Sequence, residues 1–161
     1  PTPHPQPSRC VPHPPFSLPT DPYASAKLNT FFTDLSAKLT RYLDWVELEP
    51  EIWCVVVTGN GRAFSCGGDL EAWLKATQEG KGEISGSKDN VMSKSGAAGM
   101  SRRVGTTVFV AAVNGLAFGG GMEIVTNCDL VVASEKASFC LPETKRGLCS
   151  SLPSYSPLVR L

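Results

Sequence analysis

Apolar residues recur at three- and four-residue intervals in the first third of the chain. This spacing is typical of an amphipathic helix that buries one face. Asp21 and Pro22 supply a capping side chain and a proline at the first helical position. We therefore predict a helix that begins at Asp21-Pro22, ends before Pro50 and packs its stripe in the core. The stripe comprises Leu28, Phe31, Phe32, Leu35, Leu39, Tyr42, Leu43 and Val46.

Three apolar runs predict strands: Ile52–Thr58, Val108–Val113 and Asp129–Ser134. The first run is continuously apolar and β-branched, which favours a strand buried on both faces. Segments suited to helices, Leu70–Lys75 and Met122–Cys128, alternate with these runs. The alternation predicts an α/β fold built on one mostly parallel sheet with flanking helices.

Two segments lack this pattern. Residues 1–22 hold most of the chain's 13 prolines, so we predict a flexible or polyproline-like tail that resembles neither a secretory signal nor a transit peptide. Residues 77–104 are rich in Gly, Ser, Lys and Asn, which predicts a mobile loop with a short helix around Met100 to Arg103. The predicted organisation is this tail followed by one core domain, residues 23–161.

Composition narrows the functional classes. The chain has 161 residues, with 15 basic and 15 acidic side chains and a net charge of +0. This balance does not support a nucleic-acid or membrane-surface role, and no apolar run is long enough to span a bilayer. The six cysteines form no C-x-x-C pair, and the only histidines are His4 and His13. We therefore expect no metal site and a reducing, intracellular compartment.

Two glycine turns each precede a predicted helix. Gly67-Gly68 lies before Leu70, and Gly119 to Gly121 lie before Met122. Helix N-termini carry unpaired N–H groups that favour a negative oxygen. Because parallel strands end at one edge of a sheet, the N–H groups of Gly68 and Gly120 could converge on one carbonyl oxygen as an oxyanion hole. The alternative is that the glycines only allow close packing of a helix on the sheet.

Two glutamates follow the second glycine turn. Glu123 lies in the first turn of the predicted helix, and Glu143 follows the elbow at Pro142. The pair could handle water and a proton beside a thioester carbonyl. In the alternative interpretation, Glu123 complements the helix dipole and Glu143 forms a salt bridge with Lys145 or Arg146. No histidine is available to activate a serine or cysteine, which excludes the triad chemistry of acyl hydrolases.

Three motifs together resemble the crotonase, or enoyl-CoA hydratase/isomerase, superfamily. They are AFSCGGDL (63–70), AAVNGLAFGGGMEI (111–124) and NCDLVVASEKASFCLPE (127–143), and the match extends from about Ala26 to Gly147. The resemblance implies a spiral of ββα turns, a coenzyme A thioester as substrate, no further cofactor, and an enolate held by two backbone N–H groups.

The resemblance also implies roles for individual residues. Gly68 and Gly120 match the oxyanion-hole donors, and Glu123 and Glu143 match the catalytic glutamates of members that hydrate an enoyl thioester. The loop that lines the coenzyme A cleft in the family corresponds to Ala63, Phe64, Asp69 and Leu70.

Because both glutamates are present, hydration or dehydration of an acyl-CoA is the expected reaction. A double-bond isomerase that relies on Glu143 alone is the alternative from the same family, and a non-catalytic acyl-CoA-binding or interaction fragment is the alternative from another class. We expect an acyl-CoA partner, no nucleic acid and no membrane. A homotrimer or hexamer is expected from the family.

The resemblance fades at both ends of the chain. The proline-rich tail replaces an expected β-hairpin, and Ser150–Ser156 replaces an expected glycine-rich turn. We therefore expect a truncated member, incomplete at both ends and poorly active or inactive in isolation, from mitochondria or peroxisomes.

Overall fold

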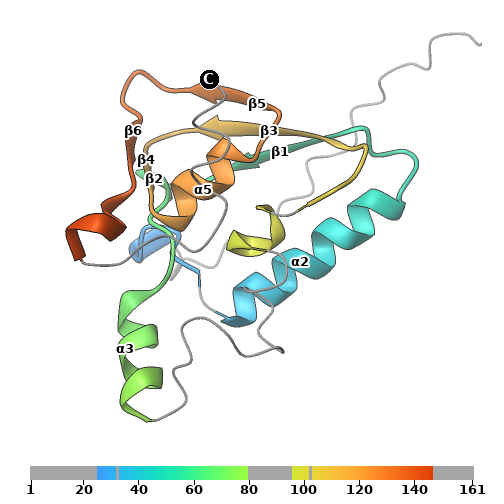
Figure 1. Ribbon diagram of the computed structural model, residues 1–161. Coiled ribbons are helices and arrows are strands. Elements are labelled where there is room, and N and C mark those ends of the chain that lie inside the picture. The colour runs from blue at the N-terminus through green and yellow to red at the C-terminus, as the bar shows by residue number, and fades with distance from the viewer. Residues whose placement is uncertain (1–24, 32, 80–95, 102, 147–161) are drawn as a thin grey trace, which may run out of the picture.

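The computed structural model describes residues 25–31, 33–79, 96–101 and 103–146 (Figure 1). The predicted tail, residues 1–22, lies outside this range, as do residues 147–161. The elements, in chain order, are α2 (Thr33–Leu48), β1 (Cys54–Thr58), β2 (Ala63–Ser65), α3 (Leu70–Gln78), η1 (Ala97–Gly99), β3 (Val108–Val113), β4 (Leu116–Phe118), α5 (Gly120–Thr126), β5 (Leu130–Ala133), β6 (Ser138–Cys140) and η2 (Pro142–Arg146).

The strands form two parallel sheets rather than the single sheet predicted from the apolar runs. One sheet has the order β1-β3-β5 and the other the order β2-β4-β6. The register pairs Val56 with Val110 and Val110 with Leu130 in the first sheet, and Ala117 with Phe139 in the second. The three strands of the second sheet have only three residues each, so they carry too little alternation to be recognised from the sequence.

The predicted first helix is interrupted, because Ser25 and Ala26 are helical but the regular helix α2 begins only at Thr33. Leu28 and Asn29 have φ values of 58° and 53°, and this left-handed conformation cannot continue a right-handed helix. Phe31 instead forms an isolated parallel bridge with Gly68, and α2 starts at Thr33. The Asn29 side chain donates to the carbonyls of Asn60 and Ala63 at 2.9 and 2.8 Å, which helps to hold the unusual backbone.

The core lies on one face of the β1-β3-β5 sheet. Alternate residues of β3, namely Phe109, Ala111 and Val113, point into it. Its other members come mainly from β2, α2, η1 and α5, with α5 in front of β1 and β3 in Figure 1. The buried hydrophobic cluster comprises Phe31, Leu43, Val46, Phe64, Ala97, Ala98, Met100, Phe109, Ala111, Val113, Ala117, Ile124 and Val125.

The prediction that the first strand is buried on both faces is wrong for the described structure. Side chains of β1 alternate between exposed and half-buried, and Val56 is 63% exposed. All four residues of β5 are exposed as well. One face of this sheet therefore packs on the core and the other is open among the described residues.

The segment 77–104, predicted as a mobile loop, overlaps two regular elements. Helix α3 continues to Gln78, and the buried turn η1 spans Ala97–Gly99. The short helix expected around Met100 to Arg103 is thus found slightly earlier in the chain. Residues 80–95 and 102 lie outside the described range. Among the described residues, no helix has the length and apolar character needed to cross a membrane.

Candidate active site

The short sheet brings the candidate residues to one edge. Strands β2, β4 and β6 are parallel and adjacent in that order. Gly67-Gly68 follows β2, Gly119-Gly120 follows β4, and η2, which carries Glu143, follows β6. Because parallel strands deliver their carboxyl ends to the same edge, the two glycine turns and Glu143 lie together there.

The two glycine turns are in direct contact. A Cβ atom on Gly67 would lie 2.6 Å from the nitrogen of Gly120, and a Cβ on Gly120 would lie 3.4 Å from the Cα of Gly67 and 2.8 Å from the ring of Phe31. Gly67 and Gly119 also have positive φ values of 79° and 54°. The glycines therefore do permit close packing, as the alternative interpretation proposed. This packing brings the Gly120 turn against the Gly67-Gly68 turn.

The backbone on either side of Gly68 forms hydrogen bonds with Phe31. Phe31 N–H donates to the Gly67 carbonyl at 2.9 Å, and Asp69 N–H donates to the Phe31 carbonyl at 3.0 Å. Since the C=O and the N–H of one trans peptide group point in opposite directions, the Gly68 N–H points away from Phe31. A Cβ on Gly68 would meet no described atom within 4 Å, so the space beside its Cα is open among the described residues.

Glu123 is buried in the first turn of α5, which starts at Gly120 rather than at Met122. Its side chain is one of the largest fully buried ones, with a residue exposure of 2%. The Oε1 atom accepts hydrogen bonds from the Ser101 hydroxyl and from the Ala97 N–H, the latter at 3.2 Å. The carboxylate is therefore held by a separate segment of the chain and does not merely complement the dipole of its own helix.

Glu143 lies against the same glycine turn from the other direction. Its Oε1 is 3.0 Å from the position that a Cβ on Gly119 would occupy. Its Oε2 is buried without a hydrogen-bond partner among the described residues. The salt bridge with Lys145 that the sequence allowed is not formed, and the Arg146 side chain is outside the described range. A buried, unpaired carboxylate oxygen is costly and calls for a functional explanation.

Gly119 connects the two glutamates. Its carbonyl accepts a hydrogen bond from the Glu123 N–H at 3.0 Å, while its Cα faces the carboxylate of Glu143. Gly119 is also tied to the end of β6, because its N–H donates to the Cys140 carbonyl at 2.9 Å. Both glutamates thus depend on the turn that carries Gly120.

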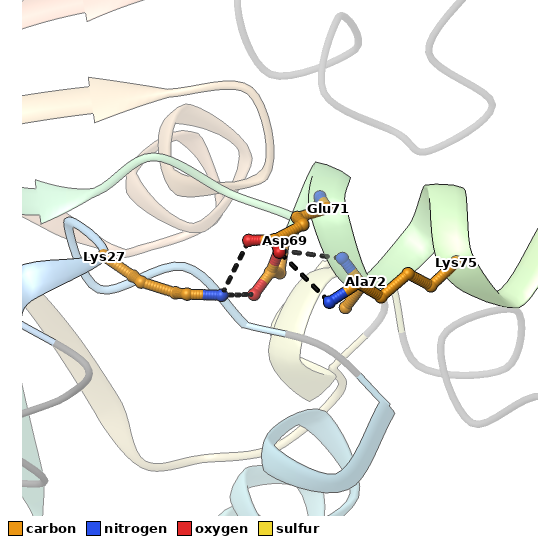
Figure 2. Close-up of polar contacts among 5 residues, drawn as sticks. All are labelled: Lys27, Asp69, Glu71, Ala72 and Lys75. Carbon is orange, nitrogen blue, oxygen red and sulfur yellow. Dashed lines mark hydrogen bonds and ion pairs between the residues drawn. The ribbon is translucent and has the colours of Figure 1, made fainter.

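Asp69 has a structural role that Figure 2 shows. Its Oδ1 accepts from the N–H groups of Glu71 and Ala72, both at 3.0 Å, which caps α3. Its Oδ2 pairs with Lys27 at 3.1 Å. The Ala72 N–H and Lys27 together lower the pKa of the Asp69 carboxyl. Since Asp69 follows Gly68 directly, the cap and the ion pair also anchor the first glycine turn.

The other residues predicted to line a coenzyme A cleft differ in their exposure to solvent. Ala63 and Phe64 are buried in β2, and the Ala63 carbonyl accepts from the side-chain amides of Asn29 and Asn114 at 2.8 and 3.2 Å. Leu70 is 71% exposed at the start of α3. That these residues line a coenzyme A cleft stays a prediction.

Two half-buried thiols, Cys66 and Cys128, are poorly suited to nucleophilic chemistry. Burial raises the pKa of the Cys128 thiol to about 11 and also raises the pKa of the Cys66 thiol. Such thiols are poor nucleophiles because little thiolate is present at neutral pH. No cluster of three or more His, Cys, Asp or Glu side chains suited to a metal ion occurs among the described residues.

Sequence reasoning missed the groups that hold the site. Ser101 and Ala97 lie in a segment that was predicted as a mobile loop with a short helix around Met100 to Arg103, and nothing in their spacing from Glu123 indicates the contact. Lys27 was placed within a continuous helix, which hid its ion pair with Asp69. The one signal in the sequence was the Gly/Ala-rich run 96–99 shortly before Ser101, since small residues permit close approach of the backbone.

Comparison with known proteins identifies the family of the chain. A family model described as enoyl-CoA hydratase/isomerase matches residues 24–159. A mevalonyl-coenzyme A hydratase of Aspergillus fumigatus is 39% identical over 135 residues, which are 84% of this chain and 47% of the relative. A carnitinyl-CoA dehydratase of Salmonella enteritidis is 38% identical over 120 residues, which are 70% of this chain and 40% of the relative.

Solved structures agree with this assignment. A carnitinyl-CoA hydratase from Mycobacterium avium superposes with a TM-score of 0.70 at 34% identity, covering 84% of this chain and 49% of that one. A putative enoyl-CoA hydratase/isomerase (crotonase) from Legionella pneumophila gives a TM-score of 0.65 at 27% identity, with 84% and 50% covered. The chain therefore spans about half the length of the relatives it matches. The α/β crotonase fold expected from the motifs is confirmed, and the chain belongs to the enoyl-CoA hydratase/isomerase family.

Proposed function

We propose that this chain carries the catalytic groups of an enoyl-CoA hydratase or dehydratase. The observation that carries the proposal is the arrangement at Gly119-Gly120, where two glycine turns touch and the Glu143 carboxylate faces Gly119, while Glu123 lies in the first turn of the helix that starts there and its carboxylate is buried. The reaction needs no cofactor beyond the coenzyme A of its substrate.

The N–H groups of Gly68 and Gly120 would hold the thioester carbonyl oxygen. When water adds to Cβ of the enoyl group, the double-bond electrons move toward the carbonyl and this oxygen becomes an enolate oxygen. Fixed backbone donors stabilise the developing negative charge, and one such donor contributes about 3 kcal/mol to lowering the barrier. The direction of the Gly68 N–H, away from its backbone partner Phe31, supports this role.

The two glutamates would divide the proton transfers. Glu123 accepts a proton from water as the water oxygen bonds to Cβ, and Glu143 donates a proton to Cα as the enolate collapses. Dehydration runs the same steps in reverse, so each glutamate exchanges its role. The buried position of Glu123 and the unpaired Oε2 of Glu143 support these assignments.

The names of the relatives suggest the class of acyl group. Two of them are named for mevalonyl-CoA and carnitinyl-CoA. We therefore include both thioesters, with crotonyl-CoA as the simplest enoyl substrate, among the compounds to be tested. The homotrimer or hexamer expected for the family is a separate prediction, which sedimentation of the purified chain tests.

Substitution of each glutamate tests the proposal. Hydration of crotonyl-CoA, or dehydration of a hydroxyacyl thioester, should fall by about 10²–10⁴-fold in both Glu123→Gln and Glu143→Gln, because each variant removes one proton-transfer group. Glu135→Gln is the matched control, since Glu135 is exposed in the turn after β5.

The outcomes separate the candidate functions. Retention of double-bond isomerisation in Glu123→Gln with loss in Glu143→Gln would identify an isomerase instead. Calorimetric binding of the thioesters without any turnover would identify a non-catalytic acyl-CoA binder.

A further inference from the structure

We propose that Ser101 is a positioning residue that holds the carboxylate of Glu123 in the orientation needed to accept a proton from water. This inference rests on the proposed function, and it adds a residue that neither the motifs nor the helix pattern indicated. Ser101 does not reach the reacting atoms in this account, because it acts through Glu123.

A closed set of hydrogen bonds supports this role. The Ser101 hydroxyl donates to Glu123 Oε1, and the Ala97 N–H donates to the same Oε1 at 3.2 Å and to the Ser101 oxygen at 3.0 Å. All three residues are buried. Two donors on one carboxylate oxygen fix the rotation of the carboxylate, so they also set the direction of Oε2.

The backbone of η1 is built to present these donors. Gly96, Ala98 and Gly99 all have positive φ values, of 72°, 51° and 80°. Ala98 is the notable case, since a non-glycine residue adopts this conformation at an energetic cost and such strain concentrates at functional sites. The strained turn points the Ala97 N–H at Glu123.

Close packing on both sides keeps the turn in place. A Cβ on Gly96 would lie 2.4 Å from Ser101 Cβ and 3.3 Å from Glu123 Oε1. On the other side, a Cβ on Gly99 would lie 2.7 Å from the hydroxyl of Thr40 in α2. The turn is thus fixed between α2 and α5, and Figure 1 shows η1 between these helices.

Three serine variants test the proposal. Ser101→Ala removes the donor, and Ser101→Cys replaces it with a weaker donor. Ser36→Ala is the matched control, because the Ser36 hydroxyl is also buried but has no hydrogen-bond partner among the described residues. All three change a buried serine by one atom.

A graded loss of kcat is the expected result. Ser101→Ala should lower kcat by about 10–100-fold with KM changed less than twofold, because misplacement of a catalytic group slows chemistry without weakening substrate binding. Ser101→Cys should fall between Ala and the native residue, and Ser36→Ala should match the native chain. In a Glu123→Gln background, Ser101→Ala should cause no further loss. An unchanged kcat in Ser101→Ala, or an equal loss in Ser36→Ala, would overturn the proposal.

A second readout separates this inference from the proposed function. If the native chain shows no turnover with any thioester, the proposed function fails. The contact between Ser101 and Glu123 is then measured by urea unfolding of Ser101→Ala, Glu123→Gln and the double variant. Non-additive changes in stability support the coupling between the two side chains. Additive changes mean that Ser101 does not hold Glu123, and the inference falls whatever the chain catalyses.

Discussion

The two sheets of this chain differ in what they carry. The β1-β3-β5 sheet has the longer strands and packs the hydrophobic core on one face, while Val56, Leu130 and Val132 remain 63%, 59% and 66% exposed on the strands themselves. The β2-β4-β6 sheet has strands of three residues, and the glycine turns and Glu143 follow its carboxyl ends. The long sheet therefore provides bulk burial, whereas the short sheet provides close contacts between backbone segments.

This difference predicts unequal tolerance to substitution. At the edge of the short sheet, single atoms matter because backbone groups touch backbone groups. On the open face of the long sheet, whole side chains contact few described atoms. The following variants probe the contrast, from the largest expected effect to the smallest.

Loss of one backbone donor should have the largest effect. Gly68→Pro removes the N–H that we assign to the oxyanion hole, and the rate of enoyl-CoA hydration should fall by about 10²–10³-fold. Gly68→Ala keeps the N–H and adds a methyl group that meets no described atom within 4 Å, so its rate should stay close to that of the native chain. A folded Gly68→Pro variant with the native rate would remove Gly68 from the site.

One methyl group on α5 should destabilise the fold. A Cβ on Gly121 would lie 2.1 Å from the carbonyl oxygen of Ser65, so Gly121→Ala must push α5 away from β2. We expect a loss of about 1–3 kcal/mol in the free energy of unfolding, measured by urea denaturation. Gly68→Ala again serves as the control, with a loss near zero. Equal stabilities of the two alanine variants would contradict the close approach of α5 and β2.

Asp69, which anchors the first glycine turn, should contribute less to the free energy of unfolding than the close packing at Gly121. Asp69→Ala removes the cap of α3 and should cost about 1 kcal/mol of stability at pH 7, whereas Asp69→Asn keeps a capping oxygen and should cost less. The pKa of Asp69 is lowered in the folded state, so its charge contributes stability above the unfolded pKa of about 3.9 and loses it as the pH falls through the folded pKa.

The difference in stability between the native chain and Asp69→Asn should therefore shrink between pH 7 and pH 3. Urea unfolding at both pH values measures it. A difference that stays constant over this range would show that the charge of Asp69 is not involved.

Substitution on the open sheet face should have the smallest effect. Val132, which pairs in register with Ala112, is an exposed residue of β5. Val132→Thr should change the free energy of unfolding by less than about 0.5 kcal/mol. A loss several times larger would show that this face is covered in solution. The two sheets would then differ less in their tolerance to substitution.

The sequence predicted the long sheet better than the short one for a physical reason. The run Val108–Val113 forms β3 with the predicted bounds, because six apolar residues bounded by turns are a clear signal. The run predicted at 129–134 forms β5, which is one residue shorter at each end. The strands of the short sheet were not predicted, because a run of three residues such as Ala63–Ser65 is too short to show a periodicity.

The sequence predicts that the two glycine turns converge, because parallel strands end at the same edge of a sheet. That reason is correct, but the long apolar runs are not the strands involved. The turns do meet because parallel strands share an edge, but the strands concerned are β2 and β4 rather than the long apolar runs. The interruption of the predicted first helix could not be foreseen, because nothing in the composition reveals that Leu28 and Asn29 adopt positive φ. Ser101 was equally hidden, since its contact with Glu123 depends on the strained turn at Ala98.

Polarisation of a bound thioester carbonyl tests the central claim most directly. We suggest NMR of an acyl-CoA analogue labelled with ¹³C at the thioester carbonyl, bound to the native chain, to Gly68→Ala and to Gly68→Pro. Two N–H donors at the Gly68–Gly120 edge should move the carbonyl resonance downfield in the first two proteins and much less in Gly68→Pro. The same resonance position in all three complexes, with binding retained, would contradict an oxyanion hole at this edge.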